Sequence, residues 1–185
     1  MKRRDAVKQL LSQRADLLVI AGLGSTAWDC TAAGDSPLTF PMWGAMGQAA
    51  MMGLGVAIAQ PARRVLVITG DGEALMGLGA LATIGVQKPE NLTLVVIDNE
   101  RYGETGMQDT HTAHGVDLAG VARACGFNIF DSQQIKNAIH HVPGPNFACI
   151  KVEAEKIPLV LPPREGALLK ARFRRALLGA QADAE

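Results

Sequence analysis

The chain has 185 residues, 48% of them hydrophobic, and its 18 basic and 18 acidic side chains leave no formal net charge. This length predicts one globular domain, with or without a tail, that buries on the order of 70% of its unfolded surface. The balanced charge argues against nucleic acid or an anionic membrane as the main partner.

Expected helices and strands alternate along the chain. The strands are short apolar runs of the kind buried on both faces of a sheet, and the helices are apolar on at least one face. In chain order we expect a helix over 3–13, a strand over 16–21, a helix over 44–59, a strand over 64–69, a helix over 74–85, a strand over 92–98, helices over 117–125 and 132–140, and a strand over 147–152.

This alternation predicts a fold of the α/β class: a doubly wound, mostly parallel sheet with helices on both faces. We expect a domain over 1–160 and a C-terminal helical tail over 161–185, which either docks a partner or is a solvated terminal helix. The charged N-terminus has no apolar secretory core, and Cys30, Cys125 and Cys149 form no disulfide or zinc pattern. We therefore expect a cytoplasmic protein.

The segment VITGDGEALMG places Asp71 directly after a buried strand, between Gly70 and Gly72. In open α/β sheets, ligands bind outside the carboxyl ends of the strands, and the start of the following helix favours a phosphate. An aspartate would repel that phosphate unless a hard cation lay between them. The position therefore indicates Mg²⁺, with Asp71 as one ligand.

A second oxygen ligand is available at the end of the next strand. Asn99 follows Gly72 after 26 intervening residues, the length of one helix, one loop and one strand. A single crossover of this kind brings the ends of the two strands side by side. Either residue alone would be interpreted as a helix or turn cap, but the pair at this spacing favours a metal site.

The pattern of GDG followed by DN, with 26 residues between Gly72 and Asn99, resembles the GDG…NN motif of the cofactor-phosphate (PP) domain of thiamine-diphosphate-dependent enzymes. The similarity covers about residues 22–152 and includes the segment FPMWGAMGQAAMMGLGVAIAQPARRVLVITGDGEALMGLGALATIG. It is strongest with the separate β subunits of sulfopyruvate and phosphonopyruvate decarboxylases, in which a YG.TG.Q pattern also follows. Asp98 stands where the wider family has the first asparagine, and Arg101 where glycine is common.

The resemblance implies roles for individual residues. Asp71 and Asn99 would be the side-chain ligands of Mg²⁺, with the backbone carbonyl of Arg101 as a third. Met46 would hold thiamine diphosphate in its bent form, with the Gly44 carbonyl and the Met46 amide bonded to the aminopyrimidine. The implied cofactor-binding residues are Gly24, Ser25, Thr26, Gly44, Met46, Gly70, Asp71, Gly72, Glu73, Ala74, Asn99, Arg101 and Tyr102.

Candidate catalytic residues follow the metal loop, in YGETGMQDTHTAH. The family places side chains over the thiazolium and the substrate here, so Glu104, Thr105 and His111 are the candidates. A histidine can move protons near neutral pH. The alternative is a surface loop whose histidines have no catalytic role.

The glutamate that activates the pyrimidine belongs in this family to a separate PYR domain, and this chain is too short to contain one. The resemblance therefore implies one subunit of a split enzyme, with a PYR-domain α subunit as partner and self-association to a dimer or larger. The implied reaction is the non-oxidative decarboxylation of a small 2-oxo acid, such as sulfopyruvate or phosphonopyruvate, to an aldehyde.

Other functions are open from the sequence. The chain could be a non-catalytic thiamine-diphosphate-binding or regulatory subunit, or half of another carboligase or oxidoreductase. The oxidoreductases normally add iron–sulfur clusters, which three scattered cysteines cannot hold. The segment VIAGLGSTA suggests a nicotinamide-binding domain, but this glycine fingerprint is weak alone. The full fingerprint requires a second strand that ends in an acidic residue, whereas the polar segment after Ala27 is expected to be a loop.

Overall fold

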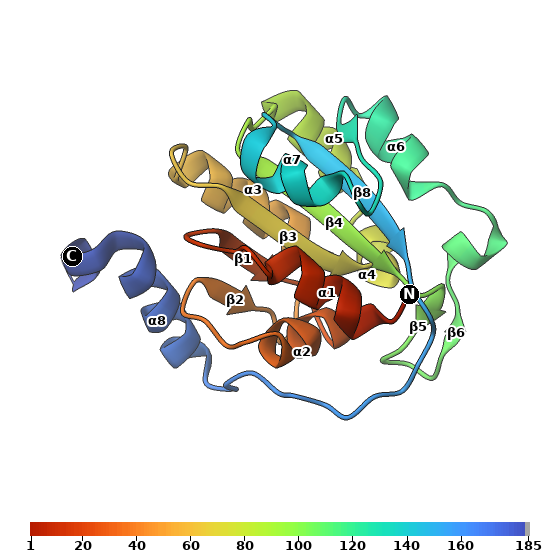
Figure 1. Cartoon of the computed structure of the whole chain (residues 1–185), viewed down its shortest axis with the longest axis horizontal. Helices are drawn as coiled ribbons and strands as arrows, with labels where there is room; N and C mark the ends of the chain where they lie inside the picture. The colour runs from red at the N-terminus through yellow and green to blue at the C-terminus, as the bar shows by residue number, and fades with distance from the viewer. Residues whose placement is uncertain (184–185) are drawn as a thin grey trace.

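The computed structural model describes residues 1–183 and is built on one six-stranded sheet (Figure 1). All strand pairs in this sheet are parallel, which confirms the predicted doubly wound fold. In spatial order the strands are β2 (Thr39–Pro41), β1 (Leu18–Ala21), β3 (Val65–Gly70), β4 (Leu92–Asp98), β8 (Asn146–Lys151) and β7 (Asn128–Ile129). A short antiparallel hairpin, β5 (Arg101–Tyr102) and β6 (Gln108–Asp109), lies outside it.

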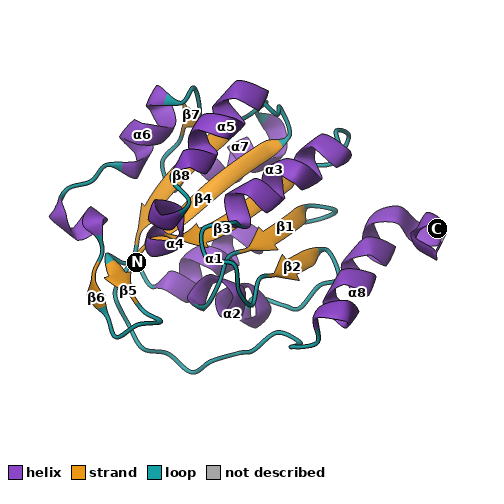
Figure 2. Cartoon of the chain, turned by 180° about the vertical axis from the view of Figure 1, so that it is seen from behind, coloured by secondary structure: helices purple, strands orange, loops and turns teal. Residues whose placement is uncertain are grey.

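Helices cover both faces of the sheet because alternate side chains of each buried strand point to opposite faces. Val19, Leu66 and Val95 pack against one group of helices, and Ile20, Val67 and Leu94 against the other. The first group is α1 (Arg3–Leu11), α2 (Ser25–Ala32) and α7 (Ile135–His141). The second, facing the viewer in Figure 2, includes α3 (Ala49–Ala59), α5 (Gly79–Gln87) and α6 (Leu118–Ala124).

The strand order places a topological switch point beside β1. The chain passes from β1 to β2 on one side and then crosses back to β3 on the other side. Loops at the carboxyl ends of β1 and β3 therefore leave in opposite directions, which opens a crevice where such folds bind ligands. The short helix α4 (Asp71–Met76) and the 3₁₀ helix His111–His114 also lie at this edge of the sheet.

Three expectations for helices and loops were wrong in detail. The polar segment after Ala27 is helical as far as Ala32, and the strand β2 that follows ends at Pro41, without the acidic residue of a dinucleotide fingerprint. The helix expected over 44–59 begins only at Ala49, since Ala45 adopts a left-handed φ of 56°. The helix expected over 74–85 is two helices, α4 and α5, separated at 77–78.

The C-terminal segment crosses the molecule and packs on the edge of the sheet. From β8 the chain runs in an extended path to α8 (Gly166–Leu178), which is followed by a 3₁₀ turn, Gly179–Asp183 (Figure 1). Phe173 of α8 packs edge-to-face on Phe40 of β2, and Arg172 forms an ion pair with Asp35. The division of the chain at residue 160 stays a prediction. None of the helices within residues 1–183 is both long and apolar enough to cross a bilayer.

Candidate active site

A cleft opens at the carboxyl edge of the sheet, at the switch point. Its walls come from the loop after β1, the loop before α3, the start of α4, and the β4–β5–β6 segment. The predicted site residues that line it are Ser25, Thr26, Met46, Gly70, Asp71, Gly72, Glu73, Asn99, Arg101, Tyr102, Glu104 and Thr105. Residues far apart in the sequence thus meet in one place.

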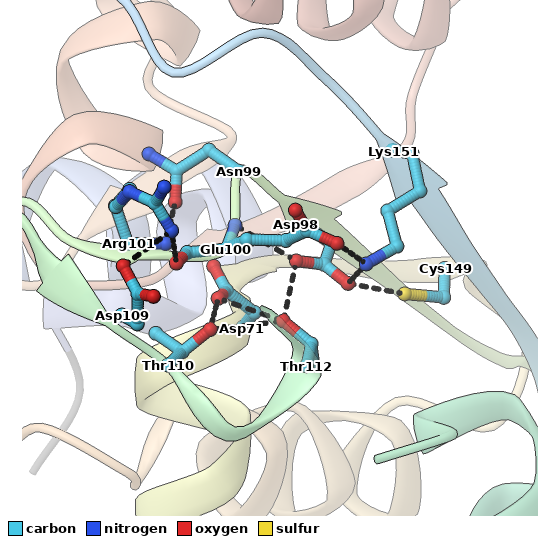
Figure 3. Close-up of polar contacts among 10 residues, drawn as sticks. All are labelled: Asp71, Asp98, Asn99, Glu100, Arg101, Asp109, Thr110, Thr112, Cys149 and Lys151. Carbon is cyan, nitrogen blue, oxygen red and sulfur yellow. Dashed lines mark hydrogen bonds and ion pairs between the residues drawn. The ribbon is translucent and has the colours of Figure 1, made fainter. Parts of the chain in front are cut away.

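The Asp71 carboxylate is buried, with 2% of its surface exposed, and is held by two hydroxyl groups. Its Oδ2 atom accepts hydrogen bonds from Thr110 Oγ1 at 2.6 Å and from Thr112 Oγ1 at 3.3 Å (Figure 3). Burial raises the pKa of Asp71 and the charge of Asp98 adds to the rise, while the Thr110 hydrogen bond opposes it. Within residues 1–183, no cationic side chain forms an ion pair with Asp71.

Asn99 and Arg101 lie beside Asp71 in a turn that follows β4. The Asn99 Oδ1 atom accepts a hydrogen bond from the Arg101 backbone N–H at 3.0 Å, which closes a tight Asx turn. Glu100, between them, has a left-handed φ of 61°, a costly conformation for this residue type that often occurs at functional sites. The Arg101 side chain pairs with Asp109 across the β5–β6 hairpin.

These donors fit a hard cation. Mg²⁺ prefers carboxylate, amide and carbonyl oxygens, and Asp71, Asn99 and the Arg101 carbonyl supply one of each within the same loop pair. A cation would also balance the buried Asp71 charge. Within residues 1–183, no group of three or more His, Cys, Asp or Glu side chains is arranged to hold a metal ion.

Glu73 joins two segments that were predicted to contact the diphosphate. It is buried, and its Oε2 atom accepts hydrogen bonds from the Leu23 backbone N–H at 3.1 Å and from Thr69 Oγ1 at 2.8 Å. Burial raises the pKa of Glu73, while the hydrogen bond from Thr69 opposes the rise. The sequence indicated only a backbone contact for Glu73, whereas its side chain ties the start of α4 to the loop after β1.

Met46 and Tyr102 approach the glycine of the GDG turn. A Cβ atom on Gly72 would lie 2.7 Å from the Tyr102 ring and 3.7 Å from Met46 Cε, so glycine is required for this packing. Met46 reaches the cleft from a loop in which Ala45 is left-handed, at the amino end of α3. The two large side chains therefore flank the GDG turn.

The three candidate catalytic residues differ in whether they line the cleft. Glu104 and Thr105 line the cleft, where the Glu104 carboxylate packs against Gly24. His111 is outside the lining, and its Nδ1 atom lies 3.3 Å from the Tyr102 hydroxyl. His111 therefore contacts a residue that lines the cleft but does not line the cleft itself.

Three of the predicted cofactor-binding residues do not line the cleft, and four residues that do line it were not predicted. Gly24 is the N-cap of α2, Gly44 is exposed, and Ala74 borders a smaller cavity behind α4. The additional lining residues are Arg3, Leu23, Ile97 and Gly103. Arg3 comes from α1 and is paired with the buried Asp29, a long-range contact that no local motif announces.

Comparison with known proteins assigns the chain to a protein family. The family model "Thiamine pyrophosphate enzyme, C-terminal TPP binding domain" matches residues 24–152. The chain belongs to this family, which confirms the resemblance in the sequence and identifies a thiamine-diphosphate-binding domain. The fold agrees: benzoylformate decarboxylase from Polynucleobacter necessarius superposes with a TM-score of 0.67 at 17% identity, covering 84% of this chain and 34% of that one.

Two relatives within the family show the similarity in more detail. The chain is 36% identical over 186 residues to sulfopyruvate decarboxylase subunit beta of Methanothermobacter thermautotrophicus, with 99% of each chain covered. It is 43% identical over 123 residues to phosphonopyruvate decarboxylase of Streptomyces viridochromogenes, which covers 66% of this chain but only 30% of that protein. The chain thus matches one relative almost end to end, and spans about a third of the longer relative and of the superposed structure.

Proposed function

We propose that the chain is the PP-domain subunit of a split, Mg²⁺-dependent thiamine-diphosphate decarboxylase acting on a small 2-oxo acid of the sulfopyruvate or phosphonopyruvate type. The observation that carries this is the buried Asp71 carboxylate beside Asn99 at the cleft. A near end-to-end match to a sulfopyruvate decarboxylase subunit supports the reaction class. The product would be CO₂ and an aldehyde.

Asp71, Asn99 and the carbonyl of Arg101 would hold Mg²⁺ against the diphosphate of the cofactor. Backbone N–H groups at Gly72, Glu73 and Ala74, and in the turn at 24–26, would bond the phosphate oxygens. The Glu73 side chain fixes these two segments relative to each other through Leu23 and Thr69. Rigid spacing of this kind presents the donors without further ordering when the cofactor binds.

When bound, thiamine diphosphate supplies the electron sink that accepts the electron pair released as CO₂ leaves the 2-oxo acid. Met46 would support the bent cofactor, and Gly44 would bond its pyrimidine ring. Glu104 and Thr105, from the loop that closes over Gly24, would orient the substrate or move a proton. His111 would act on that proton through the Tyr102 hydroxyl.

A PYR-domain α subunit would complete the site. The relative that this chain matches end to end is named a subunit beta, which implies an alpha partner, and this chain covers only 30% of the longer phosphonopyruvate decarboxylase. We expect a hetero-oligomer with more than one copy of each chain, in the cytoplasm, where the free thiols of Cys30, Cys125 and Cys149 would remain reduced.

We expect the partner subunit to bind the surface formed by α3 and α5. No charged residue occurs between Ser36 and Ala62 or between Ala74 and Gln87. The two helices lie side by side in Figure 2, and Ile58 and Val86 on their outer surfaces are 58% and 77% exposed. An uncharged face with exposed aliphatic side chains is typical of a protein interface.

This surface has a direct test. Ile58→Glu or Val86→Glu should release the partner from the tagged chain while the circular dichroism spectrum and unfolding midpoint stay close to wild type. Val116→Glu, at another exposed aliphatic position (39% exposed), is the matched control and should keep the partner. Retention of the partner by both α3 and α5 variants would place the interface elsewhere.

The function itself is tested on the tagged chain purified from its own cells. We expect a heteromer with an α/β partner subunit of about 20 kDa, the size of one domain, with bound thiamine diphosphate and Mg²⁺. The complex should release CO₂ from one of a panel of small 2-oxo acids, and Asp71→Ala should lose the Mg²⁺-dependent binding of the cofactor. A homo-oligomer without thiamine diphosphate would favour a non-catalytic or orphan subunit, and an electron acceptor requirement would favour the oxidoreductase alternative.

A further inference from the structure

Two threonine hydroxyl groups lie between two buried carboxylates at the edge of the cleft (Figure 3). Thr110 Oγ1 and Thr112 Oγ1 are 2.9 Å apart. Thr110 contacts Asp71 Oδ2 at 2.6 Å, and Thr112 contacts Asp98 Oδ1 at 2.8 Å. None of these four side chains has more than 6% of its surface exposed, so water is a poor substitute for any of the bonds.

The shortest contacts give each hydroxyl group a carboxylate acceptor. An ionised carboxylate only accepts, so Thr110 Oγ1 donates to Asp71 and Thr112 Oγ1 donates to Asp98. Thr112 Oγ1 also makes a longer contact of 3.3 Å with Asp71 Oδ2, and either threonine oxygen can accept from the other. Loss of the Thr110 hydroxyl therefore removes the shorter of the two hydroxyl contacts to Asp71.

The far side of the network is anchored on β8. Asp98 Oδ2 pairs with Lys151 Nζ at 2.9 Å and accepts from Cys149 Sγ at 3.5 Å (Figure 3). Asp98 Oδ1 also accepts from the Glu100 backbone N–H, and the Thr110 backbone N–H donates to the Glu100 carbonyl. Asp98 therefore has its own cation and fixed donors, while Asp71 has hydroxyl donors but no paired cation within residues 1–183.

We propose that Thr110 is a positioning residue for the cation: it holds the Asp71 carboxylate in the orientation that binds Mg²⁺, and Thr112, tied to Asp98, keeps Thr110 in place. A carboxylate that gives one oxygen to a metal commonly has its other oxygen hydrogen-bonded by the protein. The arrangement also gives a task to Asp98, which occupies the place of the usual asparagine: it anchors the threonine loop. This inference rests on the proposed function, since it assumes that Asp71 is a metal ligand.

The test measures cation affinity rather than turnover. The full chain, purified with the partner it carries and stripped of metal, is titrated with Mn²⁺ at saturating thiamine diphosphate, and free Mn²⁺ is followed by electron paramagnetic resonance. Removal of an outer hydrogen bond to a metal ligand typically lowers affinity about 10- to 100-fold. We expect this loss for Thr110→Val, recovery to within about threefold for Thr110→Ser, and about a tenfold loss for Thr112→Val.

Thr93→Val is the matched control. Thr93 is equally buried and lies at the other end of β4, where Asn146 is its partner at 3.5 Å. This variant should bind Mn²⁺ as the wild type does. The unfolding midpoint of each metal-free variant shows whether it folds; if Thr110→Val does not, the comparison of Thr112→Val with Thr112→Ser decides instead.

Each outcome separates this inference from the proposed function. If wild type binds Mn²⁺ and the valine variants bind it equally well, the positioning role is overturned while the metal site stands. A serine variant as weak as its valine counterpart would also overturn it, because the hydroxyl would then not matter. If wild type itself binds no Mn²⁺ with thiamine diphosphate, the proposed function fails, and this inference with it.

Discussion

Gly77→Ala tests how the Met46 loop is held against the start of the GDG helix. Gly77 ends α4, and a Cβ atom placed on it would lie 2.0 Å from the Gly47 carbonyl oxygen and 2.8 Å from the Gly47 carbonyl carbon. The obstacle is backbone, so no side-chain rotation can remove the clash. Because Gly47 directly follows Met46, an alanine must displace the loop that carries Met46 or shift the end of α4.

The expected cost has two opposing parts. Forcing a methyl group into closely packed structure costs about 1–3 kcal/mol. Replacing glycine by alanine returns about 0.4–1 kcal/mol, since it restricts the unfolded chain. With the middle of each range, about 2 kcal/mol lost and about 0.7 kcal/mol returned, the free energy of unfolding should fall by about 1.3 kcal/mol. With a urea dependence of about 2 kcal/mol/M, the unfolding midpoint would drop by about 0.6–0.7 M.

Urea unfolding and a cofactor titration measure both effects. Thiamine diphosphate binding, followed by fluorescence of Trp43 three residues before Met46, should weaken at least about tenfold, equivalent to 1.4 kcal/mol. Gly166→Ala, at the first residue of α8 where a Cβ atom meets open space, should be as stable as wild type or slightly more so and bind the cofactor normally. If Gly77→Ala matches wild type in both measurements, the Gly47–Gly77 contact does not position Met46.

Three further predictions follow from burial. Because burial raises the pKa of Asp71 in the folded protein, ionisation of this carboxyl destabilises the metal-free protein as pH rises above the unfolded pKa of about 3.9. Asp71→Asn should therefore unfold at a higher urea concentration than wild type at pH 7, and this difference should vanish near pH 4. An equal difference at both pH values would contradict this. Burial raises the pKa of the Cys30 and Cys149 thiols to about 12, so iodoacetamide at pH 8 should label neither in the native protein but both in urea, as mass spectrometry would show. Phe173→Ala removes the contact with Phe40 and should expose α8 to trypsin while residues 1–151 stay resistant; an unchanged digestion pattern would show that α8 is held by other contacts.

Strands with long apolar runs were predictable, because burial on both faces leaves an unmistakable pattern in the sequence. β3 and β4 are of this kind. β2 has three residues and ends in proline, and β7 has two, so neither is long enough to show a period. The helix α2 was missed because its polar sequence is stabilised from a distance: Asp29 pairs with Arg3 and Arg4 of α1.

Site residues were predictable where their separation along the chain determines their distance in the fold. Asp71 and Asn99 are such residues, since one crossover unit separates them and brings the ends of their strands side by side. Thr110 and Thr112 carry no such signal, because a lone threonine in a loop is common and its partner across the fold is unknown. The same holds for the Glu73 side chain, whose acceptor role depends on the position of the loop after β1.

The position of the first residue bears on how such a subunit can be joined to another. The Met1 ammonium group lies 3.4 Å from Glu153, just beyond the carboxyl end of β8, and Figure 1 places the N-terminus at the tips of β4 and β8. A polypeptide fused ahead of Met1 would leave the domain at the same edge as the cleft. A short flexible linker could then hold a second domain there at millimolar effective concentration, so that one gene product could replace two without a new contact.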